Sequence, residues 1–106
     1  MKVLDIRDLV AFTDDEPRRR TLIEGERLWS EVICLQGSQG LGPIRDDDAD
    51  GILLVLAGEV ATQVGKGRAR MKQWESIGVP AGLELTVRNA SDDPSVVLLV
   101  VAPPPS

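Results

Sequence analysis

The residues with the clearest potential for chemistry are four closely spaced carboxylates, Asp46, Asp47, Asp48 and Asp50, followed by Gly51. Oxygen donors at alternate positions, with glycine at the sixth, match the first half of an EF-hand calcium loop. The second half does not match. Its last position, which needs a bidentate glutamate, is alanine, and an apolar run typical of a strand replaces the exiting helix. We therefore interpret the segment as a solvated acidic loop.

Histidine is absent from the chain, and Cys34 is its single cysteine. Catalysis by a serine or cysteine nucleophile through a histidine base is thereby excluded. One thiol cannot form an internal disulfide, which suits a reducing compartment, and its position in an apolar run favours a core residue. General acid or base chemistry through Asp46 or Glu84 is the remaining route to catalysis.

Composition narrows the function classes further. A chain of 106 residues forms one domain, and its formal net charge of −5 opposes binding to a polyanion such as nucleic acid. The N-terminal residues lack the apolar core of a signal peptide, and no apolar stretch approaches the roughly 20 residues that cross a bilayer. We expect a cytoplasmic protein with neither nucleic acid nor membrane as a partner.

Hydrophobic periodicity predicts an all-β fold. Residues 5–10 allow one short helical turn, and after Arg19 alternating apolar positions are separated by turn signals such as Gly65-Lys66-Gly67 and residues 90–94. Many short strands at this spacing indicate a sandwich or barrel. The predicted strands are residues 21–24, 27–35, 52–56, 60–64, 68–73, 77–79, 83–88 and 95–102. The predicted organisation is an N-terminal segment (1–18), a β-barrel (19–102) and a Pro-rich tail (103–106).

Two stretches of the chain resemble the paired motifs of the cupins, in particular the small single-domain conserved-barrel kind. Gly58 matches the closing glycine of the first motif. The second motif, Pro-x-Gly-x-x-His-x-x-x-Asn, matches residues 80–89, with Leu85 where the histidine belongs and Trp74 in place of the usual opening glycine. The resemblance implies a jelly-roll, or double-stranded β-helix, barrel over residues 19–102.

The resemblance also implies where a metal would be held. Cupin metal centres use three imidazoles and one carboxylate, and the matching positions in this chain are Ile44, Asp46, Gly51 and Leu85. Only Asp46 has a donor atom, whereas a transition metal needs several converging ligands. We therefore expect neither a metal nor another cofactor.

Strand alternation, taken in the phase of the family's ligands, predicts which side chains face the barrel interior. The candidate pocket-lining residues are Ile44, Asp46, Leu53, Val55, Leu85 and Val87. The candidate rim residues are Trp29, Arg45, Gln63, Trp74, Glu84 and Arg88. A pocket so lined is mostly apolar.

Three function classes stay open at this point. The first is a metal-independent barrel that binds a small apolar or mixed molecule, and the second is a dimeric structural or interaction protein whose cavity is filled. The third is a metal-free enzyme that uses carboxylate chemistry. In all three we expect a homodimer, because residues 52–56 and 96–101 are apolar at successive positions and the barrel interior covers only one of their faces.

Overall fold

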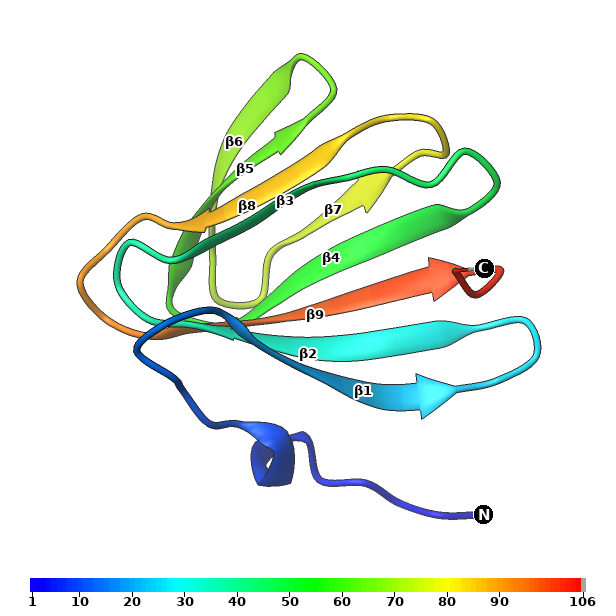
Figure 1. Cartoon of the computed structure of the whole chain (residues 1–106), viewed down its shortest axis with the longest axis horizontal. Helices are drawn as coiled ribbons and strands as arrows, with labels where there is room; N and C mark the ends of the chain where they lie inside the picture. Colours follow the sequence, from blue (N-terminus) through cyan, green and yellow to red (C-terminus); the bar gives the residue numbers. More distant parts are fainter. Residues whose placement is uncertain (106) are drawn as a thin grey trace.

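The computed structural model describes residues 1–105, and nearly all of its regular structure is β-strand (Figure 1). A single 3₁₀ turn, η1 (Ile6–Leu9), precedes the strands. The strands are β1 (Arg18–Glu24), β2 (Trp29–Leu35), β3 (Gly40–Ile44), β4 (Asp50–Ala57), β5 (Glu59–Val64), β6 (Gly67–Lys72), β7 (Ser76–Val79), β8 (Leu85–Asn89) and β9 (Ser95–Ala102).

The strands form two antiparallel sheets. The five-stranded sheet has the order β1-β2-β9-β4-β7, and the four-stranded sheet has the order β3-β8-β5-β6. The chain crosses repeatedly from one sheet to the other, so that strands distant in sequence become neighbours (Figure 1). This arrangement confirms the all-β jelly-roll barrel that the motifs implied.

Aliphatic side chains fill the space between the two sheets. All strands except β1 contribute inward-facing residues to this core, at the alternate positions that the period of a half-buried strand requires. Leu53, Val55, Val60, Val87 and Val97 have no exposed surface. The other buried members of the cluster are Ile33, Leu35, Met71, Leu85 and Leu99.

The opposite face of the five-stranded sheet carries a second, smaller cluster. Val32, Cys34 and Val96 are buried there because the N-terminal segment lies across them. Ile6, Leu9, Val10 and Phe12 supply the apolar contacts from that segment. The segment therefore covers one end of an apolar sheet face and leaves the rest of that face open.

Most elements expected from the sequence are present with small shifts of their ends. The helical turn is the 3₁₀ turn η1, and the hairpin at Gly65 and Lys66 joins β5 to β6. One strand, β3, was not predicted. The last barrel strand ends at Ala102, so the described part of the tail, residues 103–105, leaves the sheet, and Ser106 lies outside the described residues. None of the helical structure within residues 1–105 is long and apolar enough to span a membrane.

Candidate functional site

The four positions that match the family's metal ligands meet at one end of the barrel. Ile44 from β3, Gly51 from β4, Leu85 from β8 and Asp46 from the β3–β4 loop all border the same cavity. Its volume is only about 40 Å³. The other lining residues are Ala49, Asp50, Val79, Pro80, Leu83, Leu99 and Val101.

The acidic loop closes this end of the barrel through hydrogen bonds that it accepts from the backbone of the turn before β8. The Gly82 amide donates to the carbonyl of Asp46 at 2.9 Å, and the Ala81 amide donates to Oδ1 of Asp50 at 2.9 Å. Within the loop, the Asp48 amide donates to Oδ1 of Asp46 at 2.9 Å. Two of the four aspartates are thus engaged in holding backbone, which gives the loop a structural role.

The donor set does not fit a transition metal. Of the four positions at the cavity, Asp46 alone provides a side-chain oxygen. Within residues 1–105 no three acidic or cysteine side chains gather into a ligand cluster, and this holds for the acidic loop as well. A catalytic zinc site usually takes three protein ligands, so no reaction step is derived through a metal at this position.

The pocket-lining candidates divide into two groups. Ile44, Asp46 and Leu85 border the cavity. Leu53, Val55 and Val87 lie deeper in the barrel, fully buried in the aliphatic core. These three pack against other side chains of the core and do not line the cavity.

The rim candidates are more scattered. Arg45 is exposed near the barrel mouth, where its ion pair with Asp47, 2.7 Å long, raises the pKa of the guanidinium. Glu84 is also exposed, and its charge adds slightly to that effect on Arg45. Trp29 is half-buried and packs against the aliphatic core.

The other three rim candidates lie away from the cavity. Gln63 and Arg88 share the outer face of the four-stranded sheet, where both border a surface groove. Trp74 lies in the turn between β6 and β7 and is 78% exposed.

An ion pair between a buried carboxylate and a partly exposed arginine was not predicted. Glu31 on β2 is only 4% exposed, and the Arg19 guanidinium on β1 donates to both of its carboxylate oxygens, with Nε at 3.1 and 3.2 Å. The sequence does carry a signal, because Glu31 has the phase of Ile33 and Leu35, which face the core. A carboxylate in that phase needs a partner of opposite charge.

Cys34 is buried beneath the N-terminal segment, on the face opposite the barrel interior. Burial raises the pKa of its thiol, and a hydrogen bond with the Ala11 backbone and the charge of Arg18 oppose this only in part. A nucleophilic cysteine needs the reverse shift, so this environment suits an inert core residue.

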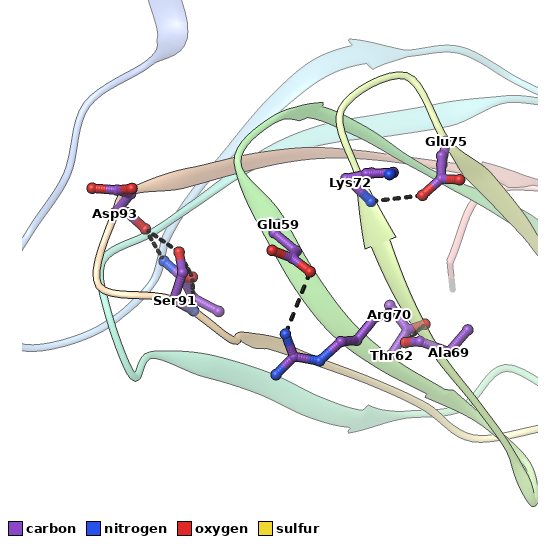
Figure 2. A network of polar contacts seen from close by, with 9 residues as sticks. Glu59, Thr62, Ala69, Arg70, Lys72, Glu75, Ser91 and Asp93 are labelled. Carbon is purple, nitrogen blue, oxygen red and sulfur yellow. Dashed lines mark hydrogen bonds and ion pairs between the residues drawn. The ribbon is translucent and has the colours of Figure 1, made fainter.

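Trp74 occupies a backbone conformation that is normal for glycine. Its φ is +76°, and it is the third residue of a turn closed by a hydrogen bond of 3.0 Å from the Glu75 amide to the Lys72 carbonyl. The Glu75 carboxylate also accepts from the Lys72 amide at 2.9 Å (Figure 2). A positive φ at this turn position favours glycine, which is the residue the family motif usually has there.

The Trp74 side chain forms one wall of an apolar groove outside the barrel. The groove has a volume of about 630 Å³ and lies where the N-terminal segment meets β4 and β9. Its other lining residues are Ile6, Arg7, Val10, Leu56, Ala57 and Val96.

Comparison with known proteins agrees with this geometry. The cupin domain family matches residues 31–101. No curated protein shows significant similarity to the chain.

Solved structures with the same fold come from several bacteria. TT1209 from Thermus thermophilus is 27% identical, with a TM-score of 0.94 over 99% of this chain and 100% of that one. An uncharacterized conserved protein with a double-stranded β-helix domain from Klebsiella pneumoniae is 19% identical, with a TM-score of 0.89 over 97% and 90% of the two chains. An RmlC-like cupin from Desulfovibrio desulfuricans is 22% identical, with a TM-score of 0.85 over 99% of each chain.

Proposed function

Because this chain belongs to the cupin family, through a match over residues 31–101, we propose that it is a metal-independent cupin that acts through its outer surface as a homodimer. The observation that carries this proposal is the filled interior. The cavity at the ligand positions has about 40 Å³, whereas pockets for small molecules usually have roughly 300 to 1,000 Å³. It has room for a few water molecules only.

The filled interior weakens the two alternatives. A small apolar ligand inside the barrel would have to displace side chains such as Leu53 and Val55, which have no exposed surface. Of the two carboxylates considered for catalysis, Asp46 borders the cavity, whereas Glu84 is exposed and does not. Asp50 also borders the cavity, but so small a space leaves no room for a substrate to meet either carboxylate.

The outer face of the five-stranded sheet supports the homodimer. We call Ile52, Leu54, Leu98 and Val100 the outer apolar patch; all four lie in the phase opposite to the core residues of β4 and β9. Ile52 is 49% exposed although it lies in the middle of the sheet, where it pairs with Val100 on β9 and Gly78 on β7. An apolar surface of this kind on a small domain favours a protein partner.

Trp74 extends the same surface. Leu56, which lines the Trp74 groove, follows Ile52 and Leu54 on the same side of β4, so groove and patch are continuous. A positive φ for a bulky residue costs about 1 to 3 kcal/mol. Neither this cost nor the exposure of the indole is offset by burial within the monomer. An exposed aromatic side chain beside an apolar groove is typical of an interface hot spot.

A second copy of the chain is the occupant that best fits this surface. The patch is uncharged and lies next to the groove, so a twofold axis can bring one patch against the other with like residues facing. Across a twofold axis a charged side chain would face the same side chain of the partner and repel it. The outer apolar patch contains no charged side chain, so two copies can meet there without repulsion.

The experiment is light scattering coupled to size exclusion at micromolar concentration. We expect the wild type to be a dimer and Ile52→Lys to be a folded monomer, because a lysine at this half-exposed position brings two like charges together only in the dimer. Leu28→Lys is the matched control, since Leu28 is 41% exposed in the β1–β2 loop, outside the patch. A monomeric wild type, or equal dissociation of both variants, would contradict the proposal.

A further inference from the structure

The outer face of the four-stranded sheet carries three arginines around a floor of smaller residues. Arg88 on β8 and Arg70 on β6 both pair with Ala61 on β5, so they flank it from either side. Arg68 and Thr86 flank Gln63 in the next outward-facing row. The neighbours on the opposite face include Val60 and Thr62, which are buried.

These residues line a groove of about 540 Å³. Strands lie about 4.8 Å apart, so the Cα atoms of Arg70 and Arg88 are roughly 9.5 Å apart across Ala61. Arg68 and Arg70 are two residues apart on one strand, or about 7 Å. A guanidinium reaches several ångströms beyond its Cα, so all three head groups can meet a single small molecule above Ala61.

The charges in the groove are incompletely neutralised. Arg70 is 3.4 Å from the Glu59 carboxylate, in an ion pair whose side chains are 67% and 43% exposed (Figure 2). An exposed pair of this kind is weak and can exchange for a ligand. Arg68 and Arg88 make no ion pair with any residue in the range 1–105. Two free guanidinium groups thus face one groove in a chain whose net charge is −5.

The other charged groups around the groove do not fill it. Lys72 lies opposite Glu59 in the strand register at one end of β6. Glu84 precedes β8 at the other end of the sheet. Neither Lys72 nor Glu84 lines the groove. The centre, over Ala61 and Gln63, is bordered by arginines and uncharged residues alone.

We propose that this groove is a binding site for a small molecule that carries two oxyanion groups, either a diphosphate or a dicarboxylate. The planar guanidinium binds phosphate and carboxylate oxygens through paired, charge-assisted hydrogen bonds. The spacing within and between strands places the Cα atoms of the three arginines roughly 7 to 10 Å apart. Three guanidinium groups at this spacing suit a ligand with two anionic groups better than a ligand with one. The ligand binds on the outside of the barrel, which leaves the filled interior undisturbed.

Isothermal titration calorimetry at 150 mM NaCl, with inorganic pyrophosphate and succinate in separate arms, tests the proposal. We expect saturable binding of at least one probe with a Kd below about 1 mM. Binding of pyrophosphate alone would assign the site to a diphosphate, and binding of succinate alone would assign it to a dicarboxylate. Binding of both probes would assign it to molecules with two oxyanion groups in general. Amide shifts in NMR spectra should gather on Ala61, Gln63 and Thr86.

Two variants and a control give the site its test. Arg88→Gln should weaken binding on the order of ten-fold, because a charge-assisted contact is lost. Ala61→Glu should abolish it by placing a carboxylate between Arg70 and Arg88. Arg27→Gln, at an exposed arginine in the β1–β2 loop, makes the same charge change away from the groove and should alter the Kd by less than two-fold.

The proposal would be overturned if neither pyrophosphate nor succinate showed saturable binding. It would also be overturned if Arg88→Gln and Arg27→Gln, both folded, changed the Kd equally. Unchanged melting temperatures establish that the variants are folded. This binding experiment is independent of the proposed homodimer. The homodimer is tested by molecular mass and depends on the outer face of the five-stranded sheet, whereas the arginine groove lies on the four-stranded sheet.

Discussion

Removal of Arg19 should destabilise the protein far more than removal of the charge on its partner, Glu31. The pair is unequally buried, since 43% of the Arg19 side chain is exposed but only 5% of the Glu31 side chain. In Arg19→Met the carboxylate stays buried without a counter-charge, and breaking a buried pair in this way costs about 3 to 5 kcal/mol. The partial exposure of Arg19 places our expectation near the lower end, at about 3 kcal/mol.

In Glu31→Gln the guanidinium that remains can turn toward water. The amide retains one acceptor, so the loss should be close to that of a weakened hydrogen bond, about 1 to 2 kcal/mol. Replacing the pair by apolar residues, as in Arg19→Met with Glu31→Leu, should recover most of the loss, because no buried charge is left uncompensated.

Urea unfolding of the wild type, both single variants and the double variant at pH 7.5, at one protein concentration, measures these losses. A loss in Arg19→Met no larger than that in Glu31→Gln, or a double variant no more stable than Arg19→Met, would refute the reasoning.

Four further expectations follow from particular residues. Gly82 has a φ of +86°, so Gly82→Val should cost about 1 to 3 kcal/mol; Gly78→Val, at a strand position where an added Cβ meets nothing within 4 Å, should be nearly neutral in the same thermal melt. Elemental analysis should find no stoichiometric transition metal, and EDTA should leave the melting temperature unchanged, since Asp46 is the single donor at the family's ligand positions. The raised pKa of Cys34 means that the folded state favours the neutral thiol, so its contribution to stability is complete below the ordinary thiol pKa and is lost as the pH rises through the higher pKa of the folded state. Native protein should therefore react with a thiol reagent at pH 8 far more slowly than protein in urea. Leu85→Ala should cost about 2 to 5 kcal/mol and enlarge the adjacent cavity, and uptake of xenon or benzene by this variant, but not by the wild type, would show that the native barrel is filled.

The fold could be predicted from the sequence where strand alternation and turn signals agree. Strand β3 was missed because its residues, Gly40 to Ile44, include two glycines and a proline, which indicate a turn. Its strand conformation depends on pairing with β8, where Leu41 lies opposite Val87 and Ile44 opposite Leu85. That pairing joins residues more than 40 positions apart, so no local pattern could reveal it.

The motif positions have physical explanations that the structure supplies. Gly58 has a φ of +79°, and a Cβ there would lie 2.7 Å from the carbonyl oxygen of Pro94, so only glycine fits. Asn89 is buried, and its amide donates to the carbonyls of Leu35 and Asp93 at 3.1 and 2.7 Å. It thereby joins the end of β2 to the turn that leads into β9. These two residues support the barrel and need no metal to do so.

The positions of the polar candidates were harder to predict. Gln63 alternates with Val60, Thr62 and Val64 along β5, and this phase places it outside the barrel. The prediction placed it at the rim because a distance from the barrel mouth cannot be obtained from alternation alone. The arginine groove depends even more on tertiary structure. Its three arginines come from strands that are adjacent to β5 only through the sheet order β8-β5-β6.

The replaced ligands and the filled core are two aspects of one change in packing. Where the family has its acidic ligand, this chain has Gly51, and a Cβ at that position would meet the Val100 carbonyl oxygen at 3.2 Å and the Val79 Cβ at 3.6 Å. The side chains of Val79 and Leu99 also border the cavity, so they occupy space that a longer residue would need. Restoring a glutamate at Gly51 alone would therefore crowd the core without completing a ligand set, since Ile44 and Leu85 would still provide no donor. A metal site could return only if several positions changed together, which is why we look for this protein's function on its outer faces.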